Sequence, residues 1–228
     1  MRHLRQIIRN IIVESVGHPK MDELINRFLN DPRNLKIEVE KKYMGYTISI
    51  MNPSIPTGFI GSIEITHGFH HYQVTSDAPC LNAYLISGYS RMDQNLNLGP
   101  LLYDIAIELT QLNGLMSDRN SVSAEAQSVW NKYLTMRTDI KRKQLDDKNE
   151  KWTKNKDDDC DLFISFMKYR AQQPPESRYM GMGSSQDKKD YKSWIQGKST
   201  SPLSKVYYKD STPVIDYLTS LDRITIHN

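Results

Sequence analysis

The sequence predicts an α+β fold in which a mixed, mainly antiparallel sheet is flanked by helices. Two observations predict it. Apolar and polar residues alternate in the early part of the chain, beginning with Leu-Lys-Ile-Glu-Val-Glu at 35–40, as in half-buried strands. From residue 98 onward the apolar spacing becomes helical, interrupted by one short apolar run. A strand meander followed by a crossover is typical of α+β domains.

The individual elements follow from the same patterns. Strands are predicted over 35–40, 43–51, 59–66 and 81–89, then over 115–116 and 205–208. Helices are predicted over 21–29, 98–112, 124–136 and 214–221, with Ser123 as the N-cap of the third. At the N-terminus, apolar residues at helical spacing alternate with arginines, which predicts a short basic amphipathic helix.

These elements divide the chain into three parts. Residues 1–18 form the amphipathic leader, and residues 19–140 form the main domain. Residues 141–228 are predicted to be a charged linker and a loop-rich C-terminal extension that packs back on the domain. A length of 228 residues fits one large domain, and 38% hydrophobic with 25% charged residues is a soluble composition.

Charge and cysteine content narrow the function classes. A net charge of +3 without a clustered basic stripe makes nucleic acid an unlikely partner, and the mixed charges after Arg137 are expected to form a solvated helix or linker. Cys80 and Cys160 lack metal-ligand spacing, so we expect two free thiols in a reducing compartment and no metal. No apolar stretch approaches the length of a membrane span, which favours a cytoplasmic protein.

The loop before the helix at 98–112 is the most informative segment. It reads Gln94-Asn-Leu-Asn-Leu-Gly99-Pro100, and the helix follows directly. A helix N-terminus presents unpaired N–H groups and the positive end of the helix dipole, which favour an anion. Asn97 and Gly99 tolerate the backbone conformations of such a loop, and Pro100 suits a first helical turn.

This loop resembles the acetyl-CoA pyrophosphate loop of the GNAT superfamily of N-acetyltransferases, Arg/Gln-x-x-Gly-x-Gly/Ala. Gln94 matches the first position and Gly99 the last, while Asn97 stands where glycine is usual. The segment from Ala126 to Trp130 resembles the family's Ala-x-x-Leu-Tyr helix, with tryptophan in place of tyrosine. The resemblance covers roughly residues 35–140 and implies a GNAT-like sheet.

The resemblance also implies a co-substrate and site residues. Acetyl-CoA would be held at its pyrophosphate by Gln94, Asn95, Leu96, Asn97, Leu98 and Gly99. Its pantetheine and thioester would lie against the backbone of Ile86, Ser87, Gly88 and Tyr89, where the fourth strand splays from the next one. The acceptor would be an amine on a small molecule or a protein.

Two residues are candidates for acid–base catalysis. Glu64 is the first candidate for the general base, with His67, His70 and His71 as neighbours. Because Trp130 cannot serve as the acid, Tyr133 is the candidate for that role. Each of these residues also has a structural interpretation, which stays open. In that interpretation Glu64 faces solvent, the histidines lie in a surface loop, and Trp130 and Tyr133 lie in the core. A catalytically inactive GNAT-like scaffold with a binding or structural role is the alternative function.

The N-terminus carries a second resemblance. Residues 4–15 resemble the capsid-targeting leaders of internal head proteins of tailed bacteriophages, which end in Leu/Ile-x-Glu. Ile12-Val13-Glu14 matches that ending. This resemblance implies a phage protein packaged in the virion head and delivered into the host cytoplasm, with a virion or host protein as partner. A packing helix of the domain is the alternative.

Overall fold

The structure is a computed structural model that describes residues 19–56, 58–67, 80–90, 96–118, 122–145, 154–160 and 202–227. Its strands are β1 (Lys36–Lys42), β2 (Gly45–Met51), β3 (Phe59–His67), β4 (Tyr84–Ser90), β5 (Leu115–Met116), β6 (Lys141–Gln144), β7 (Lys205–Tyr208) and β8 (Ile224–His227). The α-helices of these described ranges are α2 (Pro19–Leu29), α3 (Gly99–Thr110), α4 (Ala124–Thr135) and α8 (Pro213–Ser220).

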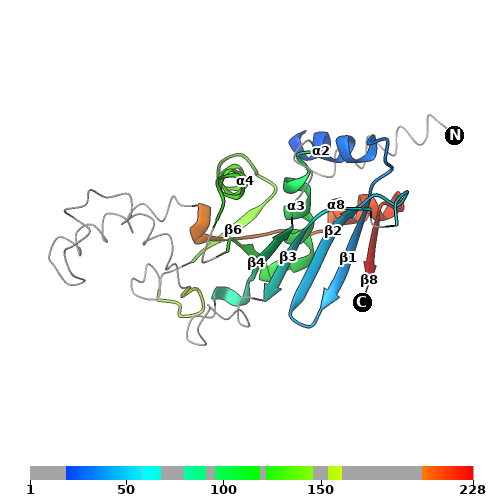
Figure 1. The fold of residues 1–228 in the computed structure, drawn as a ribbon. Helices are drawn as coiled ribbons and strands as arrows, with labels where there is room; N and C mark the ends of the chain where they lie inside the picture. The colour runs from blue at the N-terminus through cyan, green and yellow to red at the C-terminus, as the bar shows by residue number, and fades with distance from the viewer. Residues whose placement is uncertain are drawn as a thin grey trace, which may run out of the picture.

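All eight of these strands belong to one mixed sheet with the order β6-β7-β5-β4-β3-β2-β1-β8 (Figure 1). Strands β1 to β4 form an antiparallel meander. β5 is parallel to β4, β7 is antiparallel to both β5 and β6, and β8 is parallel to β1 at the opposite edge. The predicted α+β class with a mixed sheet is therefore confirmed.

The meander has one apolar face and one polar face. In β1 the buried Ile37 and Val39 alternate with the exposed Glu38 and Glu40. Register carries this pattern across the sheet, since Val39 pairs with Ile48 of β2 and that residue pairs in turn with β3. The period-2 alternation in the sequence thus predicted the correct buried face.

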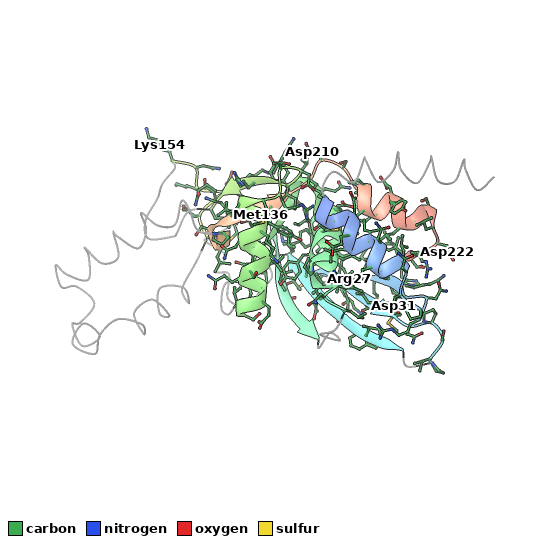
Figure 2. The ribbon with its side chains drawn as sticks, turned by 90° about the horizontal axis from the view of Figure 1, so that it is seen from above. Arg27, Asp31, Met136, Lys154, Asp210 and Asp222 are labelled. Carbon is green, nitrogen blue, oxygen red and sulfur yellow. A yellow bond between two sulfur atoms is a disulfide. The ribbon has the colours of Figure 1, made fainter. Side chains whose placement is uncertain are left out.

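The helices cover the apolar face. In the view from above, α2, α4 and α8 lie over the sheet (Figure 2), and α3 lies between α2 and the strands. Nine of the twelve residues of α3 are buried, which explains why this helix is apolar on nearly all sides. One hydrophobic core joins Phe28 of α2, Ile105 of α3, Trp130 of α4 and Leu218 of α8 to the strands.

Two strands of the C-terminal third were not predicted as such. Lys141–Gln144 lies in the charged run that was expected to be a linker or solvated helix, and that expectation is wrong because it forms the edge strand β6. A charged edge strand shows no apolar alternation, although charge is a common feature of edges that resist further pairing. Ile224–His227 forms β8 beyond the last predicted helix. The C-terminal part therefore packs back on the domain by contributing strands to its sheet.

The expectation of two free thiols is also wrong. Cys80 and Cys160, which are 80 positions apart in sequence, form a disulfide with their Cα atoms 4.7 Å apart. Both cysteines are fully buried in a second, smaller core with Leu85, Met116 and Val206, among others. A pair so distant in sequence carries no spacing signal, so only the fold reveals it.

Several predictions fall on residues outside the described ranges. These are the leader at 1–18, the histidines at 70 and 71, the loop positions Gln94 and Asn95, and the loop-rich segment at 172–201. Among the described residues, no helix combines the length and the apolar character needed to cross a membrane.

Candidate functional site

The separation of β4 from β5 is the main feature of the candidate site. Their parallel pairing begins at Tyr84 with Leu115 and ends at Leu85 with Met116. Beyond that point β4 has no pairing partner on its β5 side within the described part of the chain. The backbone of residues 86–89, which the GNAT resemblance assigns to pantetheine and thioester, lies on this free stretch. An unpaired strand edge offers N–H and C=O groups to a ligand.

A bulge lies in the same stretch of β4. Glu64 of β3 pairs with Gly88, but the next residue, Ile65, pairs with Ile86, so Ser87 is the extra residue of β4. The hydroxyl of Ser87 donates a 3.4 Å hydrogen bond to the carbonyl oxygen of Glu64. Bulges bend a strand and are frequent beside functional sites. Here the bulge falls where β4 leaves β5.

Glu64 lies beside this stretch on the polar face of the sheet. Its side chain is exposed, and an ideal Cβ built on Gly88 would lie 3.0 Å from its Oε2 atom. The structure therefore brings the predicted general base next to the predicted thioester strand. Its exposure equally fits the alternative of a solvent-facing carboxylate.

The loop that leads into α3 is the second part of the candidate site. Leu98, at the N-cap position, provides no side-chain cap, and its carbonyl oxygen accepts from the N–H of Leu101 at 3.0 Å. Asn97 has a φ of 48°, the left-handed conformation expected from its type. An ideal Cβ on Gly99 meets no atom of the described residues within 4 Å, so they leave open space beside it. Leu96 and Leu98 are buried in the main core, which anchors the loop.

The two aromatic candidates of α4 are core residues. Trp130 stacks on Tyr207 of β7 with ring centroids 5.2 Å apart, and it meets Tyr103 of α3 edge to face. The hydroxyl of Tyr133 donates a 2.9 Å hydrogen bond to Oδ2 of Asp104. Burial, followed by the charge of Asp104, raises the pKa of Tyr133 well above its usual value. Such a buried phenol is a poorer proton donor than an exposed one, which supports the core interpretation over the acid role.

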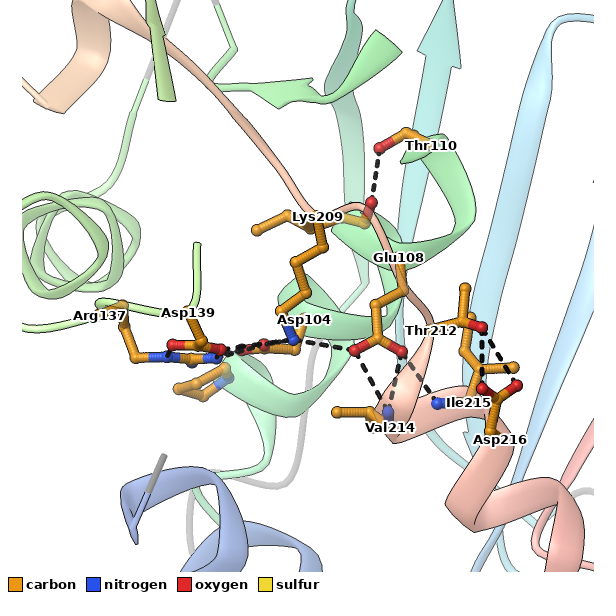
Figure 3. Close-up of polar contacts among 12 residues, drawn as sticks. Asp104, Glu108, Thr110, Arg137, Asp139, Lys209, Thr212, Val214, Ile215 and Asp216 are labelled. Carbon is orange, nitrogen blue, oxygen red and sulfur yellow. Dashed lines mark hydrogen bonds and ion pairs between the residues drawn. The ribbon is translucent and has the colours of Figure 1, made fainter. Parts of the chain in front are cut away.

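A buried network of charged side chains surrounds Asp104 (Figure 3). Arg137 donates from Nη1 and Nη2 to both of its carboxylate oxygens, at 2.8 and 2.7 Å. Lys209, just after β7, donates at 2.9 Å to Oδ1 of Asp104 and at 2.8 Å to Glu108 one turn further along α3. Asp139 completes the network through two hydrogen bonds from Arg137.

The network fixes the charge state of its members. Burial alone would raise the pKa of Asp104, but the positive charges of Lys209 and Arg137 outweigh it and hold that pKa below its usual value. Burial lowers the pKa of Lys209, but the carboxylates of Asp104 and Glu108 raise it, and the net shift is upward. Each of the two cations is therefore paired with carboxylates at close range, which compensates for the cost of burying them.

Glu108 also caps another helix. Its carboxylate accepts from the backbone N–H groups of Val214 at 3.0 Å and Ile215 at 2.9 Å, in the first turn of α8. A carboxylate at a helix N-terminus satisfies orphan N–H groups and interacts favourably with the helix dipole. Burial nevertheless raises the pKa of Glu108, against the opposing effect of Lys209. The network thus ties α3 to α4, β7 and α8.

Sequence reasoning missed this network, although one signal was present. Asp104 and Glu108 are two acids one turn apart in the otherwise apolar stretch of α3. Acids in a buried helix must be paired, so the spacing predicts buried cations. Nothing local identifies Arg137 and Lys209 as those cations, since they are 33 and 105 residues from Asp104 in sequence.

The turn that precedes β4 has an unusual backbone. Cys80, Leu81 and Asn82 have φ values of 48°, 57° and 57°, three consecutive left-handed residues without a glycine. This conformation costs roughly 1 to 2 kcal/mol per residue for L-amino acids, somewhat less for asparagine. The N–H of Cys80 donates to the carbonyl of Asp159 at 3.1 Å, and the disulfide joins the turn to Cys160. The segment 154–160 therefore holds the turn in place.

The predicted histidine cluster is described in part. His67 packs edge to face against Tyr84, with ring centroids 5.2 Å apart. Within the described ranges, no group of three or more His, Cys, Asp or Glu side chains is arranged to hold a metal ion.

No protein-family model, curated protein or solved structure matches the chain.

Proposed function

We propose that the chain is an acetyl-CoA-dependent N-acetyltransferase of the GNAT type that acts on an amine acceptor. The observation that carries the proposal is the separation of β4 from β5 after two paired residues, with a bulge at Ser87 beside it. An acyl chain can use the free backbone edge of β4, while the positive end of the α3 dipole favours an anionic group. Both features involve residues that the sequence resemblance assigns to the co-substrate, which supports the proposal.

In this proposal each part of the site has one task. The loop from Leu96 to Gly99, continuing from Gln94 and Asn95, holds the pyrophosphate of acetyl-CoA. Residues 86–89 hold the pantetheine and thioester. Glu64 removes a proton from the acceptor amine on the polar face of the sheet, where a charged or polar acceptor can reach it.

Calorimetric titration of acetyl-CoA into the full chain tests the binding step. The variant Gly99→Trp fills the open space beside the loop, and we expect it to weaken binding by about tenfold or more. Leu112→Trp is the matched control, because Leu112 is exposed at the other end of the same helical segment. Absence of binding to the wild type, or equal binding by the two variants, would reject the site.

Glu64→Gln tests the chemical step separately. It keeps the size of the side chain and removes the base, so turnover with a responsive amine should fall by about 100-fold or more while acetyl-CoA affinity is unchanged. Release of free CoA measures turnover. An unchanged rate would assign Glu64 to the solvent-facing alternative.

A second function is favoured by the core positions of Trp130 and Tyr133. Because the tryptophan cannot donate the proton and the tyrosine hydroxyl is bonded to Asp104, the candidate acid is missing or occupied. The second candidate is therefore a catalytically inactive GNAT-like phage protein with a binding or structural role in the virion or against a host protein. The disulfide suits this alternative, since such bonds persist on virions and in other oxidising surroundings. Acetyl-CoA binding without turnover on any amine would select it.

A further inference from the structure

The Cys80–Cys160 disulfide lies next to the start of the strand that carries the proposed site. Cys80 begins the left-handed turn, and Tyr84 begins β4. The first two residues of β4 are also its only ones that pair with β5 among the described residues. Any change in the turn is therefore transmitted first to the place where β4 and β5 separate.

The segment 154–160 makes several of the contacts that hold the turn. The disulfide joins Cys80 to that segment, and the N–H groups of Cys80 and Leu81 donate to the carbonyls of Asp159 and Asp157. Residues 154–157 are exposed, so this segment lies at the surface of the small core. Three consecutive non-glycine residues with φ near 50° persist only where the surroundings impose them.

We propose that the Cys80–Cys160 bond is a redox clasp that sets the geometry of the start of β4. In the oxidised form the clasp imposes the left-handed turn and keeps β4 paired with β5. In the reduced form the turn relaxes toward ordinary backbone conformations, the pairing of Tyr84 and Leu85 loosens, and the site on β4 loses its shape. The effect on ligand binding rests on the proposed function, whereas the effect on β4 does not.

The chemistry of the switch is thiol–disulfide exchange with a dithiol. The dithiol supplies two electrons and two protons, the Sγ–Sγ bond breaks, both sulfurs become thiols, and the dithiol becomes a disulfide. Both cysteines are fully buried, so the exchange requires local opening of the structure around them. The segment 154–160, of which residues 154–157 are exposed, can open in this way without unfolding of the sheet.

Hydrogen exchange of the full chain tests the clasp without any ligand. With dithiothreitol as the reductant, amide exchange in a peptide covering 83–90 should accelerate by about tenfold or more relative to the exchange of β1 and β2. The N–H of Tyr84, which donates to the carbonyl of Gly114 at 2.9 Å, is a direct reporter. Equal exchange in both redox states, or equal acceleration in all strands, would overturn the proposal.

Two variants sharpen the test. Cys160→Ser should show the reduced behaviour with or without dithiothreitol. Asn82→Gly tests the role of the turn, because Asn82 is exposed and glycine adopts a positive φ without strain. In this variant reduction should accelerate exchange at 83–90 less than in the wild type. An undiminished effect would remove the backbone conformation from the mechanism and overturn that part of it.

Acetyl-CoA titration of both redox forms then separates the two proposals. A loss of affinity of about fivefold or more on reduction supports the clasp as a regulator of the site. Equal affinity in the two forms overturns the regulatory part. If neither form binds acetyl-CoA while exchange at 83–90 still responds to reduction, the acetyltransferase proposal fails and the conformational clasp stands.

Discussion

At the scale of single residues, the buried charges around Asp104 are held by several close contacts. Asp104 accepts hydrogen bonds from Tyr133 and Arg137, which are four residues apart, and from Lys209, which is far from both in sequence. Removing two ions from water is costly, and only close, multiple hydrogen bonds compensate for it. Such a network stabilises one arrangement of the surrounding elements, because any displacement leaves a buried charge without its partner.

The first prediction concerns Lys209. Lys209→Met removes a cation and leaves Asp104 and Glu108 buried with one positive partner fewer, so the free energy of unfolding should fall by about 3 to 5 kcal/mol. Urea unfolding measures the change. Lys141→Met is the control, since Lys141 of β6 forms an exposed ion pair with Asp210. Loss of this pair should change the free energy of unfolding by less than about 1 kcal/mol. Similar losses in both variants would contradict a special role of the buried network.

At the scale of elements, two glycines differ in the space that the fold leaves beside them. Gly45 begins β2 and pairs with Thr66 of β3, and an ideal Cβ on it would lie 1.8 Å from the carbonyl oxygen of Ile65. Gly99 begins α3, and among the described residues such a Cβ has no neighbour within 4 Å. The close approach of β2 to β3 therefore explains the first glycine, whereas the described contacts leave room for a side chain at the second.

This contrast gives the second prediction. Gly45→Ala should lower the free energy of unfolding by about 2 to 3 kcal/mol, because β2 or β3 must shift to admit the methyl group. Gly99→Ala should leave stability unchanged or raise it by up to about 1 kcal/mol, since alanine favours the helix. Thermal unfolding of the two variants checks both signs. A large loss in Gly99→Ala would mean that Gly99 has a structural role after all.

The extent of what the sequence predicted also depends on the element. Strand alternation in Ile37 and Val39 identified the meander and its buried face, because both are set by neighbouring residues. The helical spacing of apolar residues around Trp130 predicted a helix over 124–136, and α4 ends one residue earlier. In contrast, β6 is a charged edge strand that exists through its pairing with β7, and that pairing is long-range. The partners of Asp104 were hidden for the same reason.

The sequence likewise predicted some features of the candidate site and not others. The sequence indicated the loop ending at Gly99 and placed Glu64 on a strand, since both depend on local patterns. It could not show that β4 leaves β5 after Leu85, or that Ser87 forms a bulge, because both depend on register between strands. Tyr133 illustrates the limit most clearly: its helix was predicted correctly, yet its hydroxyl is directed to a carboxylate from another helix.

At the scale of the whole molecule, the disulfide closes a long covalent loop. Cys80 and Cys160 are 80 positions apart, and the loop between them contains β4, α3, β5, α4 and β6, and thus most of the candidate site. A cross-link restricts the unfolded chain, and on the chain-entropy account a loop of this length contributes about 4 kcal/mol. A domain whose site lies inside the loop depends on this contribution when its surroundings are oxidising.

The last prediction follows from that dependence. In urea unfolding, the oxidised chain should be more stable than the chain in dithiothreitol by about 4 kcal/mol, less any residual structure that the reduced unfolded chain retains. Cys160→Ser serves as the control, because its stability should match that of the reduced wild type and should not respond to dithiothreitol. Equal unfolding curves for the oxidised and reduced wild type would show that the bond contributes nothing to global stability. Because the clasp predicts an additional change at β4, the two measurements together separate a redox effect on the whole fold from one on the site.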